Sequence, residues 1–158
     1  MKSIAALFAL IAVSGTASSQ ELSVRKLQNL DGGYSVKVPN DWNVRAGNSM
    51  PDFALYRVTA STGKLLLTIY VGNYPDRRVS PPLNANRSST AIAGCSATNV
   101  RWTVEAGKRF GTTLIQIKHT GWPEYADFRF GNISNGEQEL VEQVIQSFRG
   151  GAFPKCGR

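Results

Sequence analysis

The most regular hydrophobic pattern in the chain lies in residues 134–149. Apolar side chains recur there with the 3.6-residue period of an α-helix and form one stripe, made of Leu140, Val141, Val144, Ile145 and Phe148. Ser134 and Glu137 have the spacing of a capping box, in which each side chain accepts a hydrogen bond from the other residue's backbone amide. Gly150 and Gly151 follow and favour a helix end. The pattern predicts a helix over residues 134–149 whose stripe packs on a sheet formed by the preceding chain.

Alternating apolar and polar positions upstream predict β-strands. The strand-forming runs are residues 34–38, 53–60, 64–71, 100–104, 112–119 and 125–131. Pro39 ends the first run, and the connection Ser61-Thr62-Gly63 between the second and third is typical of a hairpin with a bulge. Leucines at positions 65–67 break the alternation, which predicts a central strand that is covered on both faces.

Two stretches lack this alternation. Residues 20–33 are polar and end in Asp31-Gly32-Gly33, which indicates a turn. Residues 72–99 contain three prolines and are too long for a bare loop in a compact domain, so we expect a short helical turn at residues 88–93. Strand, hairpin, crossover, meander and helix then follow in order. This order predicts an α+β fold, an antiparallel sheet with a C-terminal amphipathic helix packed on one face.

The first residues predict a secretory signal peptide. Lys2 is followed by the apolar run of residues 4–13 and by small residues up to Ser19. We expect cleavage after Ser19, which leaves a single domain over residues 20–158 in the periplasm or outside the cell. No later apolar run has the length of a membrane-spanning helix. The only two cysteines, Cys95 and Cys156, predict a disulfide in an exported chain, with two free thiols as the alternative.

The chain is basic, with 18 Lys and Arg against 11 Asp and Glu and a formal net charge of +7. This surplus favours anionic partners such as acidic proteins, lipid head groups or polyanions. The basic residues form separate doublets, among them Arg77-Arg78, and no continuous run. Because no basic face interleaved with aromatic residues can be identified, the pattern does not favour nucleic-acid binding.

Two segments resemble the PsbP-like family. Residues 34–42, Tyr-Ser-Val-Lys-Val-Pro-Asn-Asp-Trp, are similar to the opening strand, proline, turn and tryptophan of that family. Residues 128–134 and 137–148 are similar to its last strand and closing helix. The resemblance covers residues 34–149. It implies an α/β/α sandwich and a binding role, as in bacterial relatives that act as chaperones or in secretion systems, and it carries over no catalytic residue. The Cys95–Cys156 pair departs from the family pattern.

Catalytic chemistry has one candidate, His119, the only histidine. It shares strand parity with Ile115 and Ile117, and a general base there would need an acid partner such as Glu105, Glu124 or Asp127. A partly exposed histidine beside a turn is the simpler interpretation. The sequence offers no cluster of metal ligands and no nucleotide-binding or nucleophile motif. We therefore expect no enzyme activity, no metal and no cofactor.

Aromatic and arginine side chains near turns are the residues that interface centres favour. The candidates are Tyr74, Arg77, Arg78, Trp122 and Tyr125. The alternative is that Trp122 and Tyr125 complete the core and that the arginine pair is solvated. The sequence predicts an exported, non-enzymatic protein-binding module of the bacterial envelope: an immunity-type inhibitor, a chaperone or a secretion accessory factor. Its expected partner is a protein with an acidic surface. The alternative function is binding of a small or anionic ligand or surface in the periplasm.

Overall fold

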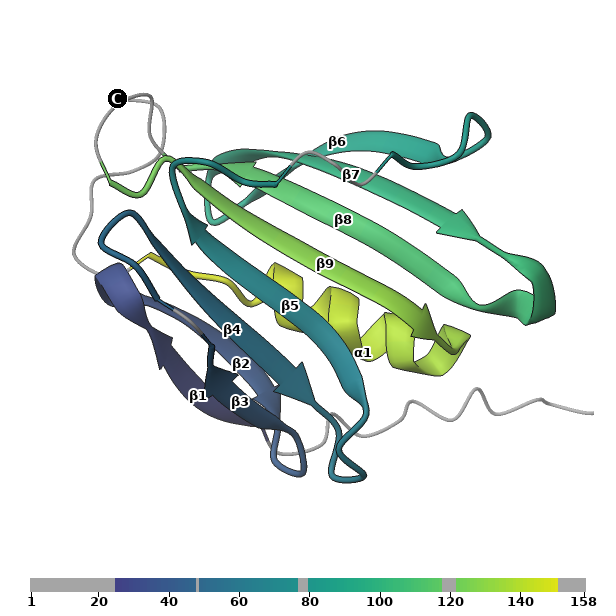
Figure 1. The fold of residues 1–158 in the computed structure, drawn as a ribbon, viewed down its shortest axis with the longest axis horizontal. Coiled ribbons are helices and arrows are strands. Elements are labelled where there is room, and N and C mark those ends of the chain that lie inside the picture. The colour runs from purple at the N-terminus through teal and green to yellow at the C-terminus, as the bar shows by residue number, and fades with distance from the viewer. Residues whose placement is uncertain (1–24, 48, 77–79, 118–121, 151–158) are drawn as a thin grey trace, which may run out of the picture.

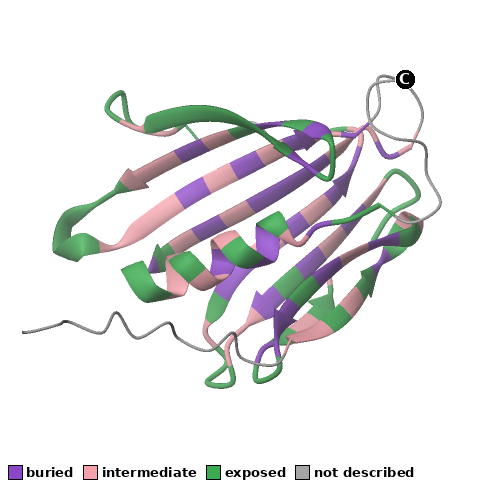
Figure 2. Ribbon diagram, turned by 180° about the vertical axis from the view of Figure 1, so that it is seen from behind, coloured by how far each residue is buried: buried purple, intermediate pink, exposed green. Residues whose placement is uncertain are grey.

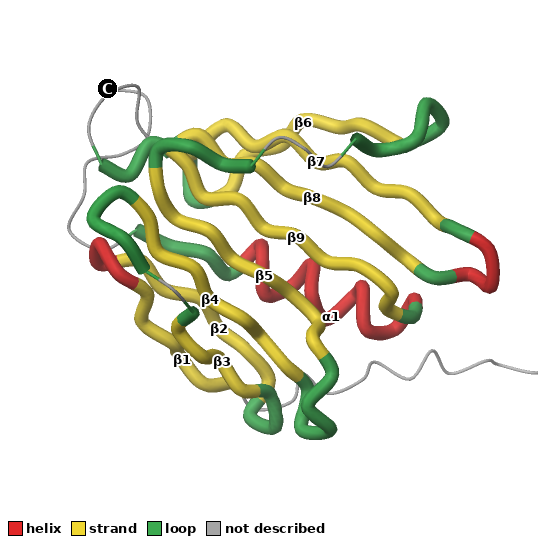
Figure 3. The backbone as a smooth tube through the Cα atoms, in the orientation of Figure 1, coloured by secondary structure: helices red, strands yellow, loops and turns green. Residues whose placement is uncertain are grey.

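The computed structural model describes residues 25–47, 49–76, 80–117 and 122–150, and all structural statements concern these. They form nine strands and one α-helix, with two single-turn 3-10 segments (Figure 1, Figure 3). The elements are β1 (Arg25–Leu30), β2 (Tyr34–Pro39), β3 (Asn43–Ala46), β4 (Phe53–Thr59), β5 (Leu65–Gly72), β6 (Asn86–Ile92), β7 (Cys95–Thr103), β8 (Arg109–Gln116), β9 (Tyr125–Ile133) and α1 (Asn135–Gln146).

The main sheet has seven antiparallel strands in the order β3-β4-β5-β9-β8-β7-β6, and β1 and β2 form a separate antiparallel hairpin. Helix α1 and the β1–β2 hairpin lie side by side on the same face of the main sheet, as the two opposite views show (Figures 1 and 2). We call this the helix face. Within the described residues, neither a helix nor a second sheet covers the opposite face, which we call the open face.

The predicted fold class is therefore wrong. The fold is mostly β, with two antiparallel sheets and one short helix, instead of a balanced α/β/α sandwich. Part of the layer expected to be helical is the β1–β2 hairpin, because residues 25–30 pair with residues 34–39 instead of forming a polar loop. The antiparallel sheet and the C-terminal helix on one face are present.

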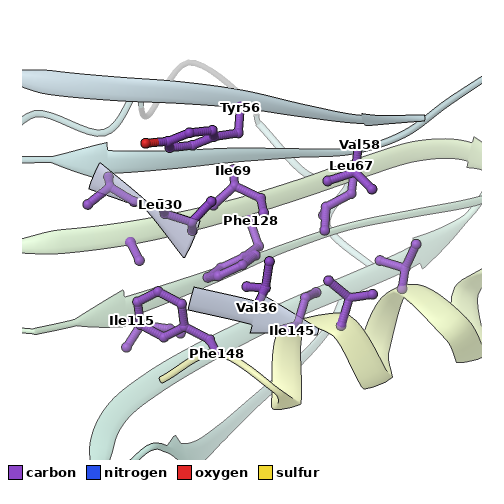
Figure 4. Close-up of a cluster of buried hydrophobic side chains, with 14 of the residues drawn as sticks. Leu30, Val36, Tyr56, Val58, Leu67, Ile69, Ile115, Phe128, Ile145 and Phe148 are labelled. Carbon is purple, nitrogen blue, oxygen red and sulfur yellow. The ribbon is translucent and has the colours of Figure 1, made fainter. Parts of the chain in front are cut away.

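The core lies between the main sheet and the helix-face layer (Figure 4). Phe128 and Ile115 from the sheet, Val36 from β2 and Ile145 from α1 are all fully buried. Phe148 follows the helix and packs edge-on against the ring of Phe128, with ring centroids 5.4 Å apart. Burial of each such side chain contributes roughly 1.5–3 kcal/mol. This layer holds the fold together.

The helix prediction is confirmed in its start and its stripe. Ser134 is the N-cap and forms the complete capping box with Glu137. Val141, Val144 and Ile145 are buried against the sheet. The helix ends at Gln146, earlier than residue 149, because the Ser147 amide caps it by donating to the last carbonyls and the Ser147 hydroxyl accepts from the Lys37 amide at 2.7 Å. The connection to β2 stops the helix before the glycines.

The helical turn expected at residues 88–93 is wrong, because this segment is strand β6. Ala93 and Gly94 form a two-residue turn with positive φ angles of 53° and 81°, and β6 and β7 pair across it. Such turns match the twist of a hairpin, so the segment joins the sheet as its last strand. Its side chains do not alternate in burial, since all but Ile92 are exposed. No hydrophobic pattern therefore marked it as a strand.

Strand β5 is central, as predicted, but it is not covered equally on both faces. Thr59 pairs with Leu65 and Val58 pairs with Leu67, so Leu66 is an extra residue in a β-bulge. The bulge lets Leu66 and Leu67 both be buried. Beyond it, the side chains on the open face are only half-buried.

Several expectations lie outside the described residues: the signal peptide over residues 1–19, His119, Arg77, Arg78 and Cys156. Cys95 is buried at the start of β7, and its predicted disulfide to Cys156 stays a prediction. No helix in the described part of the chain is long and apolar enough to cross a membrane.

Candidate functional site on the open face of the sheet

The open face is built from the strand positions that alternate with the core positions. Leu114 of β8 pairs with Thr98 of β7 on one side and with Asp127 of β9 on the other. Two residues along, Thr112 pairs in the same way with Val100 and Arg129. Because residues two apart share a face of a sheet, these six side chains form one continuous floor of three strands.

A cavity of about 240 Å³ lies over this floor. The connection from β5 to β6 supplies Pro75, Asp76 and Pro81 to its wall, and β6 supplies Arg87. We call it the open-face cavity. Its lining combines apolar side chains in the floor with charged groups at the sides, so it suits a chemical group that has both an apolar and a polar part.

One side of this cavity is closed by an ion pair whose carboxylate is buried. Asp127 is only 2 % exposed, and its carboxylate accepts hydrogen bonds from Arg129 at 2.5 and 2.8 Å and from the Thr112 hydroxyl at 3.0 Å. Arg129 also donates to the backbone carbonyl of Asp76, which ties the connection to the sheet. The charges of Asp127 and Arg129 are thus satisfied by each other, and their first role is to shape the cavity.

Arg87 differs from Arg129, because it is exposed and the structure gives it no hydrogen bond or ion pair with a described residue. A guanidinium in this state retains its fork of donors for a carboxylate or a phosphate. Among the described residues that line this cavity, Arg87 is therefore the cation that is available to a ligand or partner.

The three sequence-predicted binding residues that the structure describes lie elsewhere, at the end of the sheet where β5 ends and β9 begins. Tyr74 is 78 % exposed, and its amide donates to the Tyr70 hydroxyl at 2.8 Å. The pKa of Tyr70 is raised, chiefly because the phenol is partly buried. Tyr125 begins β9, is half-buried and pairs with Gly72.

Trp122 has a packing role at the same end. Its indole N–H donates to the Asp52 carbonyl at 2.9 Å. A Cβ atom added to Gly32 would approach the Trp122 ring to 2.8 Å, so the ring lies directly on the turn between β1 and β2. Trp122 therefore packs between two parts of the fold. None of Tyr74, Trp122 and Tyr125 lines the open-face cavity.

A second cavity of about 350 Å³ lies at the other end of the sheet, near the start of β6, and we call it the β6-end cavity. Its lining is polar and comprises Asn84, Asn86, Arg101, Trp102, Thr103, Arg109 and Gln138. Arg101 is engaged by Glu142 of α1, with Nε–Oε1 at 2.5 Å and Nη2–Oε2 at 2.9 Å. Arg109 donates only to the Thr103 hydroxyl among the described residues, at 2.5 Å. Two cavities with arginine side chains thus adjoin β6.

The described residues contain no group of three or more His, Cys, Asp and Glu side chains that could hold a metal ion. Searches of protein-family models and of curated proteins found no match for this chain.

Proposed function

We propose that this protein is a non-catalytic protein-binding module of the bacterial envelope that recognises its partner with the open face of the main sheet. The observation that supports this most directly is the size of the open-face cavity. Its volume of about 240 Å³ is below the range of roughly 300–1,000 Å³ that is typical of small-molecule sites. One or two side chains of a partner protein fill such a space, as anchor residues do at the centre of interfaces.

Charge supports an acidic partner. The chain carries a net charge of +7, and Arg87 stands at the cavity without a counter-ion among the described residues. A positive surface accelerates association with an acidic protein and orients it during the encounter. Binding of a small carboxylate or phosphate at Arg87 is the second candidate function, since the floor beside it is partly apolar.

Photo-crosslinking in the organism that produces the protein tests the proposal. A photoreactive amino acid replaces Leu114 in the cavity floor, and a second variant carries it at Gln143, which is exposed on α1. We expect a protein to be crosslinked from position 114 and not from position 143. Crosslinking from neither position, or equally from both, would contradict recognition by the open face.

The purified partner is then titrated against charge-reversal variants. Arg87→Glu should weaken binding by about tenfold, or about 1.4 kcal/mol, because it removes a rim cation and introduces repulsion. Arg45→Glu is the matched control, since Arg45 is exposed on the opposite edge strand and the change in net charge is the same. Native mass spectrometry of the protein purified from its host distinguishes the second candidate. A stoichiometric small molecule that Leu114→Trp displaces would favour a small-ligand site.

A further inference from the structure

Strand β6 is an edge of the main sheet with an unusually accessible outer side. It pairs with β7 over seven consecutive residue pairs without a register shift. Six of its seven side chains are exposed, and no described strand pairs with its outer side. The other edge strand, β3, has only four residues. A long, regular edge is a template on which a further strand can add.

The turn between β6 and β7 fixes which backbone groups point outward. In a two-residue hairpin the flanking residues, here Ile92 and Cys95, exchange both backbone hydrogen bonds. Because bonded and non-bonded pairs alternate, every second residue back from Ile92 also bonds to β7. The residues between them, Arg87, Ser89 and Ala91, therefore direct three N–H and three C=O groups away from the sheet.

Apart from the charge of Arg87, nothing in the sequence of β6 protects this row of groups. Exposed edges are usually shielded by proline, lysine, a bulge or a short strand length. Residues 86–92, Asn-Arg-Ser-Ser-Thr-Ala-Ile, contain neither proline nor lysine, and the pairing with β7 has no bulge. The edge is kept polar by its side chains, yet its backbone remains available for pairing.

We propose that an extended acidic segment of the partner protein adds to the outer side of β6 as an eighth strand. This inference rests on the proposed protein-binding function and specifies how the partner is held. Main-chain hydrogen bonds supply affinity in such strand addition, and alternate side chains supply specificity.

The acidic character follows from the charged side chains on the two faces beside β6. Successive side chains of an added strand point to opposite faces. On the open face they lie beside Arg87, and on the helix face they lie toward the cavity that Arg101 and Arg109 line. Glu142 engages Arg101, and Asp127 is engaged by Arg129. Arg109 lies on β8, two strands inward of β6, whereas Arg87 lies on β6 itself and has no ion pair to a described carboxylate, so acidic side chains on the open face of the added strand suit Arg87.

A second copy of the chain fits this edge less well. Two copies would each carry a net charge of +7 and repel one another. The exposed side chains of β6 are mostly polar, so self-pairing would bury little of the apolar area that stable homodimers need. An acidic partner is instead attracted by this positive charge.

The test uses the mature chain and a capped synthetic peptide, Thr-Glu-Val-Glu-Val-Glu-Thr, with amide hydrogen exchange followed by NMR. In the free protein, we expect the outward amides of Arg87, Ser89 and Ala91 to exchange faster than the inward amides of Ser88 and Thr90. Saturating peptide should slow the outward amides by about tenfold or more, because they gain hydrogen bonds. Unchanged exchange at these three amides would overturn the proposal.

Two peptide controls separate strand addition from simple charge attraction. A peptide N-methylated at alternate residues keeps its charge but has no N–H groups to donate along one of its edges. When the methylated residues are those whose backbone faces β6, the peptide should no longer slow the exchange of the outward amides. A peptide with Lys in place of Glu should also have no effect. Equal protection by either control peptide would contradict the proposed mode. Protection of the outward amides without peptide, together with a dimer in sedimentation, would identify a second copy as the occupant instead.

Proline variants provide the matched test on the protein. Ser89→Pro removes an outward N–H that makes no bond to β7, so the fold should remain while peptide binding is lost. Ser88→Pro removes an inward N–H and should loosen the β6–β7 hairpin. If the partner identified by crosslinking binds Ser89→Pro as tightly as the natural protein, strand addition is wrong while the protein-binding function stands. If no partner is crosslinked at the open face, the proposed function itself is wrong.

Discussion

Replacing Arg101 should weaken the fold strongly, because this side chain connects helix α1 to the main sheet. Arg101 lies on β7 with a side chain that is 18 % exposed, and its guanidinium meets both carboxylate oxygens of Glu142 on α1. It also donates to the Thr112 carbonyl and the Thr113 hydroxyl, and it lies 5.0 Å above the centre of the Phe130 ring. One side chain thus joins the helix to the sheet.

The magnitude follows from these contacts. A bidentate, charge-assisted pair in a partly buried position contributes about 1.5–3 kcal/mol. The cation–π contact adds about 0.5–1 kcal/mol, and loss of the guanidinium leaves the Thr112 carbonyl without this donor. We therefore expect Arg101→Met, which retains the apolar stem, to lower the free energy of unfolding by about 3 kcal/mol. Arg101→Lys should restore only part of this, because an ammonium group cannot reproduce the fork.

A double-mutant cycle measured by urea unfolding isolates the pair. Arg101→Met, Glu142→Gln and the double variant should give a coupling energy of about 1.5–2.5 kcal/mol. The control cycle uses Lys64 and Glu137, a more exposed pair at 2.7 Å, and should give less than about 1 kcal/mol. A coupling for Arg101 and Glu142 that is no larger than the control would refute the reasoning that burial and fork geometry set its strength.

Three further predictions concern the helix and the C-terminal segment. Val144→Asp places an unpaired carboxylate at a fully buried position and should prevent stable folding in circular dichroism, whereas Glu139→Gln, on the exposed side, should cost less than about 0.5 kcal/mol. The pKa of Glu137 is held below its ordinary value of 4.5, chiefly by hydrogen bonding to Lys64, so this carboxylate stabilises the fold above pH 4.5 and the contribution is lost as the pH falls through the lowered pKa. Urea unfolding between pH 6 and pH 3 should therefore show a smaller loss of stability in Glu137→Gln. If the predicted disulfide forms, Cys156→Ser should lower stability by about 2–4 kcal/mol, and two alkylatable thiols in the protein isolated from its host would rule it out.

The helix could be predicted from the sequence because its determinants are local. The capping box spans four residues, and the stripe repeats within three turns, so both are visible without knowledge of the sheet. The error at its end has a tertiary cause, since Ser147 is held by the backbone of Lys37, far away in the chain. The β1–β2 hairpin has a different cause, because residues 25–30 are mostly polar and only Leu30 among them is buried, so no apolar alternation indicates a strand.

Strand β6 and the open-face cavity could not be predicted in the same way. Periodicity reports a strand only when one of its faces is buried, and both faces of β6 are exposed along nearly its whole length. In the sequence, Arg87 is therefore a single basic residue within a Ser- and Asn-rich stretch. The consecutive pair Arg77-Arg78 was the more obvious candidate for a binding site. Asp127 and Arg129 carried a usable signal, since residues two apart on a strand share a face and an opposite-charge pair there can bond. From the sequence alone, Asp127 was a candidate only as the acid partner of His119.

In the proposed function, the two faces of the main sheet separate stability from recognition. On the helix face, α1 is joined to β7 by the Arg101–Glu142 pair and to the chain just before β5 by Lys64, and its apolar stripe fills the core. On the open face, the charges of the buried Asp127 and the half-buried Arg129 are satisfied within the sheet and its connection, so the floor keeps its shape without a covering layer. A partner that binds the open face and extends the sheet at β6 therefore needs no rearrangement of the core. Substitutions at exposed open-face positions such as Arg87 should then alter binding while the unfolding free energy stays nearly constant, which is the behaviour expected of a rigid binding scaffold.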